Sequence, residues 1–141
     1  MKSGSIIALI GTIRERVYRF LRHELEAEGM QGLAPSHGAI LSHLFVAGEL
    51  AMTEIARRID RDRSTVTTLV AKLVDYGYVR RSPGAEDGRV TRIRLTKKGK
   101  DIEAAFQEIS ETMIERTYRG FSDQERSTLT DLLNRVAENW E

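Results

Sequence analysis

The residues best suited to chemistry form a basic ribbon from Asp87 to Lys100, DGRVTRIRLTKKGK. Its opening Asp-Gly pair is a strong signal for a tight hairpin turn. After the turn, apolar and basic residues alternate, as in a strand with two unlike faces. One face carries Thr91, Ile93 and Leu95, and the other carries Arg92 and Arg94. Such a strand can pack its apolar face on a core and leave its guanidinium groups free to meet phosphates.

A second polar surface is predicted on a helix over residues 63–76, RSTVTTLVAKLVDY. At about 100° per residue, one side of this helix gathers Val66, Leu69, Val70, Leu73 and Val74. The other side is small, polar and rich in hydroxyls: Ser64, Thr68, Ala71 and Asp75, with Lys72 beside them and Arg63, Thr65 and Thr67 on the flanks. Such side chains allow close approach to phosphates and base edges. The alternative is a Thr-rich solvent face, although Glu, Lys and Gln are the more usual residues there.

The charge distribution also favours a polyanionic partner. The 141 residues carry a formal net charge of only +1, but the stretch from Arg57 to Lys100 holds 13 basic and 5 acidic residues, a net of +8. The remaining residues therefore sum to −7. A basic middle of this density suits nucleic acid. By itself it could also be a solvated charged face that binds nothing.

Catalysis and metal binding find little support in the sequence. There is no cysteine, which excludes thiol nucleophiles, disulfides and thiolate metal sites. Ser5 and Ser36 lie outside any nucleophile-elbow pattern. Of the three histidines, His37 and His43 are six residues apart and do not share a helix face suited to one metal. We therefore expect no enzyme activity and no cofactor.

The order of elements in the centre is typical of a winged helix-turn-helix. The pattern predicts a helix from Pro35 to about Ala47, a short extended piece at Leu50 and Ala51, and a short helix capped by Thr53. Asp62 is a good N-cap for the helix over 63–76, which ends at Gly77. Strands are expected at 78–82 and 89–96, joined by the loop PGAEDG.

Long helices are predicted at both ends of the chain. Residues 5–28 carry an apolar stripe at steps of three and four, and Gly29 and Gly32 end it. A second long helix is expected from a cap at Thr96 to about Arg119, and Ser122 with Glu125 makes a capping box for the last one. The fold class is therefore mostly α with a small β-hairpin wing. No segment resembles a signal peptide or a membrane span, so a cytoplasmic protein is expected.

The segments STVTTLVAKLVDYGYV and DGRVTRIRLTKKG resemble the MarR family of transcription regulators. The wing signature of that family is Asp-x-Arg, five residues, then Leu-Thr-x-x-Gly, and this chain matches it at Asp87, Arg89, Leu95, Thr96 and Gly99. The resemblance extends over essentially the whole chain. It implies one domain over 1–141, with a winged helix-turn-helix lobe at 34–100 and dimerisation helices at 1–30 and 101–141. It also implies a homodimeric repressor that binds palindromic operators.

By the same resemblance, the helix over 63–76 enters the major groove. Its implied DNA-facing residues are Arg63, Ser64, Thr65, Thr67 and Thr68, with Lys72 on the helix and Arg92 on the wing as further contacts. Arg89 would enter the minor groove, held by Asp87, and a narrow minor groove attracts arginine. Thr68 stands where many relatives carry arginine, which puts a guanine contact from the helix centre in doubt.

Two further expectations concern partners. Members of the family often bind phenolic or other amphipathic molecules, and by position Arg14, Tyr18, His37 and His43 could line such a site. The alternative function is a winged-helix module that docks proteins without reading DNA. That module would not need the outward arginines or the hydroxyl-rich helix face.

Overall fold

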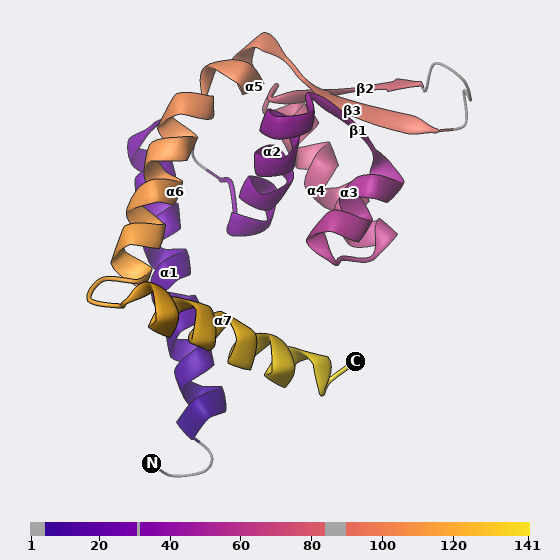
Figure 1. Ribbon diagram of the computed structural model, residues 1–141. Coiled ribbons are helices and arrows are strands. Elements are labelled where there is room, and N and C mark those ends of the chain that lie inside the picture. Colours follow the sequence, from indigo (N-terminus) through magenta and orange to yellow (C-terminus); the bar gives the residue numbers. More distant parts are fainter. Residues whose placement is uncertain (1–4, 31, 84–89) are drawn as a thin grey trace. The chain divides into compact units, whose positions relative to one another are not determined.

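The protein is described from a computed structural model that covers residues 5–30, 32–83 and 90–141 (Figure 1). Asp87, Arg89 and the rest of the loop at 84–89 lie outside the described residues. The described chain contains α1 (Ser5–Ala27), α2 (Pro35–Ala47), β1 (Glu49–Ala51), α3 (Met52–Ile59), α4 (Arg63–Asp75), β2 (Val79–Pro83), β3 (Thr91–Leu95), α5 (Lys97–Asp101), α6 (Glu103–Thr117) and α7 (Asp123–Glu138). The expectation of a mostly helical fold with a small antiparallel sheet is confirmed. No helix in the described part is long and apolar enough to cross a bilayer.

The chain divides into two compact units, Met1–Ile109 and Ser110–Glu141. The first unit holds the buried core, in which α2, α3 and α4 pack beneath the sheet (Figure 1). Its largest fully buried side chains are Met30, Ile40, Leu41, Leu44, Ile55, Val66, Val70, Leu73, Val79 and Ile93. Of the apolar stripe on α1, only Leu25 is buried. The core therefore belongs to the central elements, as the apolar pattern of 63–76 predicts.

The sheet has three antiparallel strands in the order β1-β3-β2. The short piece predicted at Leu50 and Ala51 is β1, and it pairs with the far side of β3, so that Leu50 lies opposite Ile93. Ile93 and Leu95 are buried while Arg94 is exposed. The predicted two-faced ribbon is thus confirmed, and β1 adds a third strand to the predicted hairpin.

The first residues after β3 tie the sheet to the end of α4. Thr96 Oγ1 donates to the carbonyl of Gly77 at 2.5 Å and accepts from the Gly99 amide at 3.1 Å. The Thr96 amide donates to the Tyr78 carbonyl at 3.1 Å, and Lys98 Nζ donates to the Tyr76 carbonyl at 2.6 Å. We call these contacts the 76–99 junction. They satisfy carbonyl groups that the end of α4 and its turn would otherwise leave unpaired.

Two predicted helix boundaries are wrong. Thr53 does not cap α3, which begins at Met52 and has Ala51 at its N-cap without a side-chain cap. The residues before α3 are held in β1 by pairing with β3, so the helix can start without that cap. The single long helix expected after Thr96 is divided at Ile102 into α5 and α6. The junction holds α5 against the turn after α4, while Ile102 packs against the core where the chain changes direction.

The second unit is a short helical hairpin formed by the end of α6 and by α7. The predicted capping box is present: the Glu125 amide donates to Ser122 Oγ at 3.1 Å, and the Ser122 amide donates to Glu125 Oε1 at 3.0 Å. Tyr118 packs on Phe121 with ring centroids 6.1 Å apart, and the Arg126 guanidinium lies 4.2 Å from the Tyr118 ring. No residue of α7 is buried, although several of them are large and apolar.

His37 is buried in the first turn of α2, at 4% exposure. Its Nδ1 accepts a hydrogen bond from the Ala34 amide at 2.8 Å, which caps the helix start. Burial lowers the pKa of His37 below 6.5, and the nearby charge of Lys72 lowers it further. The buried Nε2 has no hydrogen-bond partner among the described residues. The fold therefore requires the neutral imidazole.

The first prediction is that Gly99→Ala destabilises the protein by roughly 1–3 kcal/mol, measured by urea unfolding. A Cβ at this position would lie 2.1 Å from the Tyr78 carbonyl oxygen, so the 76–99 junction would have to open. Gly11→Ala in α1 is the control, because nothing lies within 4 Å of its added Cβ. That helical replacement should instead stabilise by about 0.5–1 kcal/mol. Equal effects of the two substitutions would contradict the account of the junction.

The second prediction concerns pH. Because the folded-state pKa of His37 is depressed, the stability it contributes is complete above the unfolded value of 6.5 and declines as pH falls below it. The free energy of unfolding should therefore fall as pH is lowered below about 6.5, and His37→Gln should remove part of that dependence. The same replacement at the exposed His23 is the matched control substitution. A slope that His37→Gln does not alter would overturn this assignment.

Candidate nucleic-acid interface

A tight turn of three residues joins α3 to α4 and sets the angle between them. Asp60 adopts the left-handed conformation, with φ at 53°, and it is the only non-glycine residue in the described chain with positive φ. Asp62 then caps α4 by accepting from the Thr65 amide at 2.7 Å. Hydrogen bonds from Thr65, followed by one from Ser64, lower the pKa of Asp62. The helix-turn-helix predicted at 60–62 is therefore present, with the predicted cap.

The exposed face of α4 presents hydroxyl groups in a defined orientation. Thr67 Oγ1 donates to the Arg63 carbonyl at 2.8 Å, and Thr68 Oγ1 donates to the Ser64 carbonyl at 3.1 Å. Ser64 Oγ donates to Asp62 Oδ1 at 3.2 Å. Because these hydrogens are used within the helix, the two threonine oxygens are left to accept bonds from an approaching molecule. In a major groove, the matching donors are the amino groups of adenine and cytosine.

The other predicted contacts on α4 differ in accessibility. Arg63 and Thr65 are exposed in its first turn, on the same end of the helix as the hydroxyl groups. Lys72 is half-buried two turns further on, with its ammonium group 5.8 Å from the centre of the Tyr76 ring. The N-terminal half of α4 is therefore the part that is open to a duplex.

The outer face of the sheet gathers arginines from two strands. Arg80 of β2 lies directly opposite Arg94 of β3, and both are exposed. Like charges in this position repel and destabilise a sheet, and an anionic partner would relieve that repulsion. Arg92, on the same face, is half-exposed and lies 3.5 Å from Glu49 of β1. The two other predicted wing residues, Asp87 and Arg89, lie outside the described residues.

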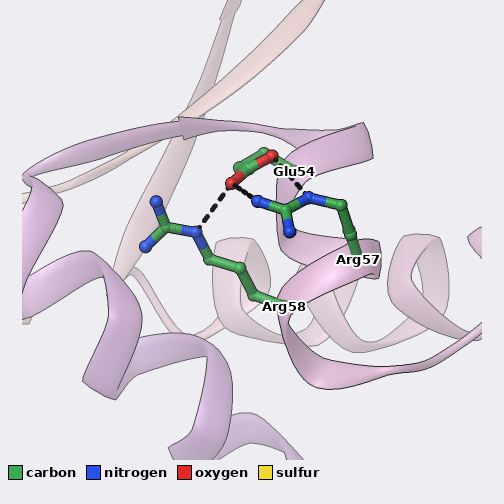
Figure 2. Close-up of polar contacts among 3 residues, drawn as sticks. All are labelled: Glu54, Arg57 and Arg58. Atoms are coloured by element: carbon green, nitrogen blue, oxygen red, sulfur yellow. Dashed lines mark hydrogen bonds and ion pairs between the residues drawn. The ribbon is translucent and has the colours of Figure 1, made fainter.

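Sequence reasoning missed a charged cluster on α3. The carboxylate of Glu54 binds the guanidinium groups of both Arg57 and Arg58, as Figure 2 shows. Its pKa falls to about 2, chiefly because of the hydrogen bond from Arg57 and then that from Arg58. The pattern Glu-x-x-Arg-Arg carried the signal, since residues three and four apart are neighbours on a helix. Glu49 was missed because its partner Arg92 lies on a strand 43 positions away in the sequence.

The residues proposed for an effector site are placed on two separate helices. Arg14 stacks over the Tyr18 ring at 4.9 Å on α1, while His37 is buried and His43 half-buried on α2. Their joint role in binding a small molecule stays a prediction. Among the described residues, no group of three or more His, Asp or Glu side chains could hold a metal ion.

Comparison with known proteins places this geometry in a family. Residues 33–91 match the MarR family. The HTH-type transcriptional repressor IacR of Pseudomonas putida is 31% identical over 94 residues, which span 67% of this chain and 56% of IacR. The uncharacterized HTH-type transcriptional regulator YpoP of Bacillus subtilis is 25% identical over 125 residues, 89% of each chain. These relatives are named as regulators and not as enzymes, in agreement with the expectation of no catalytic function.

Solved structures share the fold over nearly the whole chain. A MarR transcriptional regulator from Methanosarcina mazei Go1 has a TM-score of 0.78 and 25% identity, with 97% of this chain and 96% of that chain covered. A MarR variant from E. coli, complexed with operator DNA, has a TM-score of 0.80 and 22% identity, with 94% and 93% covered. The likeness to the second structure concerns the fold alone. The expected winged helix with flanking helices is thereby confirmed as the architecture.

The third prediction separates base contacts from phosphate contacts. Thr68→Val keeps the shape of the side chain but removes the acceptor, so it should change the base preferred at one operator position, where we expect adenine or cytosine. It should leave the salt dependence nearly unchanged. Arg80→Ala should instead weaken binding to all sequences and lower the log–log salt slope by about 1. Both are measured by binding to a panel of single-base operator variants. A uniform loss for Thr68→Val would contradict direct base contact.

Proposed function

We propose that this protein is a transcriptional regulator that binds double-stranded DNA in a sequence-specific manner. The chain belongs to the MarR family of HTH-type regulators. The observation that carries the proposal is the exposed first half of α4, with its outward acceptors and the flanking Arg63. Its fixed cap and buried opposite face hold those groups on a rigid element, as base readout requires. The MarR variant with the same fold is complexed with operator DNA.

We further propose that the protein acts as a homodimer on palindromic operators. The N-terminal part of α1 exposes large apolar side chains that its own unit leaves uncovered: Ile6, Ile7, Leu9, Ile10 and Ile13. The second unit exposes another set: Leu129, Leu132, Leu133 and Trp140. Apolar groups of this size are usually covered in a working assembly. A two-fold dimer would present two copies of α4 about 34 Å apart, one turn of B-DNA.

The wing is proposed to add a minor-groove contact. Arg89, oriented by Asp87, would enter the groove flanking the site read by α4, where the potential of an A·T-rich stretch is most negative. Arg80, Arg92 and Arg94 on the sheet would contact phosphates nearby. This assignment rests on the match of these residues to the family motif and on the basic face of the sheet.

Repression with release by a small ligand is the proposed mode of control. IacR is named as a repressor. Because the chain has no cysteine, a thiol switch is excluded, and a small amphipathic or phenolic ligand would have to act by favouring a dimer geometry that does not fit DNA. Such a regulator acts on chromosomal DNA, so we propose a cytoplasmic location.

The fourth prediction tests this function by selection of duplexes from a random pool with the purified full-length protein. The selected sites should be palindromic, with half-site centres about 10 base pairs apart. Sedimentation of the protein alone should give a dimer. Failure to enrich any sequence, together with salt-insensitive binding, would overturn the proposal and favour a protein-docking module.

A further inference from the structure

We propose that Glu54 is a positioning residue that restrains sequence-independent DNA binding by taking part of the N–H donors of Arg57 and Arg58 and offsetting part of their charge. This inference rests on the proposed function. It assigns to α3 a control on affinity, separate from the base-reading role of α4. The three residues form what we call the α3 clamp, drawn in Figure 2.

The α3 clamp is a specific arrangement and not a loose ion pair. Arg57 donates from Nε to Glu54 Oε2 at 3.1 Å and from Nη2 to Oε1 at 2.5 Å, so the interaction is bidentate. Arg58 donates from Nε to the same Oε1 at 2.9 Å. One carboxylate therefore orients two guanidinium groups at once. It is itself held, since the Glu54 side chain is only 31% exposed.

The bonds decide which donors remain for another anion. A guanidinium binds phosphate best through two parallel N–H groups, and Glu54 already takes the Nε–Nη2 pair of Arg57, which leaves its Nη1–Nη2 end for another anion. Arg58 keeps its terminal nitrogens but loses Nε. The cluster also carries a net charge of +1 instead of +2. A phosphate that approaches α3 therefore meets fewer free donors and half the charge.

The position of the clamp makes this restraint relevant to DNA. In a helix-turn-helix, the first helix crosses the sugar-phosphate backbone while the second enters the groove. Arg57 and Arg58 lie in the last turn of α3, next to the turn that leads into α4. Contacts from α3 would add affinity for every sequence alike, because phosphates carry no sequence information. Restraint of these contacts leaves a larger share of the binding to α4.

A second carboxylate in the same lobe supports this view. Glu49 lies 3.5 Å from Arg92, so acidic groups face arginines on α3 and on the outer face of the sheet. Both carboxylates precede the basic stretch from Arg57 to Lys100 in the sequence, and both pair with arginines inside it. Arg63, at the start of α4, is exposed beside the hydroxyl groups. The lobe thus pairs three of its proposed phosphate-facing arginines, Arg57, Arg58 and Arg92, with carboxylates.

The experiment compares Glu54→Gln with the wild-type full-length protein on random-sequence duplex and on the selected operator, from 50 to 200 mM salt. Gln keeps the size of the side chain and one acceptor but removes the charge. One added phosphate contact steepens the salt slope by about 0.9, so the ratio of affinities at the two salt concentrations should grow about 3.5-fold on random duplex. Binding to random duplex at low salt should tighten, and the operator-to-random ratio should fall.

Two further variants keep the test discriminating. Glu115→Gln on α6 is the matched control: Glu115 holds Arg119 by two bonds of 3.1 and 2.9 Å, so its loss changes the net charge by the same amount outside the helix-turn-helix. It should leave the slope unchanged. In an Arg57→Ala, Arg58→Ala background, Glu54→Gln should have no effect on the slope.

The outcomes separate this inference from the proposed function. An unchanged slope, or weaker binding, in Glu54→Gln while the wild type still selects its operator would overturn the restraint alone. A slope change equal to that of Glu115→Gln would reduce the effect to net charge and also overturn it. Absence of any salt-dependent DNA binding by the wild type would instead refute the proposed function.

Discussion

The interaction on which the rest of the structure depends is the 76–99 junction. A helix and a wing that bind the same duplex must keep a fixed relative orientation. Here the residues after β3 bind the consecutive carbonyls of Tyr76, Gly77 and Tyr78, which follow α4. Thr96 Oγ1 serves as donor to Gly77 and as acceptor for the Gly99 amide, so one hydroxyl joins the end of α4 to the start of α5. Gly99 is required because its Cα approaches the Tyr78 carbonyl so closely that a Cβ would overlap it. Gly77, at a φ of +81°, turns the chain so that these carbonyls face the junction.

This junction changes how the family motif is understood. Of its five matched residues, Leu95 is buried, Thr96 is a helix cap and a crosslink, and Gly99 permits close packing. None of these three needs DNA to explain it. Asp87 and Arg89, at the other end of the motif, are the two whose proposed role requires a duplex. The motif therefore combines three residues that fix the hairpin to the rest of the lobe with two residues proposed to contact DNA. A match to the motif is evidence for this packing as much as for DNA binding.

Local patterns predicted most of the elements because each is determined by near neighbours. The caps at Asp62 and Ser122 and the buried stripe of α4 each depend on residues within a few positions. Predictions of element boundaries failed where distant partners decide, whereas the cluster of Glu54, Arg57 and Arg58 was missed despite its local spacing. Thr53 is a good cap by local rules, but pairing of β1 with β3 sets the start of α3, and the junction divides the helix after Thr96 at Ile102. In the candidate site, the hydroxyl face of α4 was foreseen, whereas the bond between Glu49 and Arg92 needed the strand order.

Because acidic groups lie beside some arginines of the lobe, the positive charge available to phosphates differs from one part of its basic surface to another. An arginine beside a carboxylate retains only part of its attraction for phosphate, because the carboxylate takes its donors and offsets its charge. Arg57, Arg58 and Arg92 are in this state, while Arg94 lies between Arg80 of β2 and Glu49 of β1 in the strand register. Among the described residues, no carboxylate other than that of the cap Asp62 forms a hydrogen bond or ion pair with the exposed side chains of the first half of α4. The net charge of +8 in the central stretch therefore overestimates the electrostatic attraction that is the same for every DNA sequence. It also underestimates the difference in affinity between the operator and other sequences.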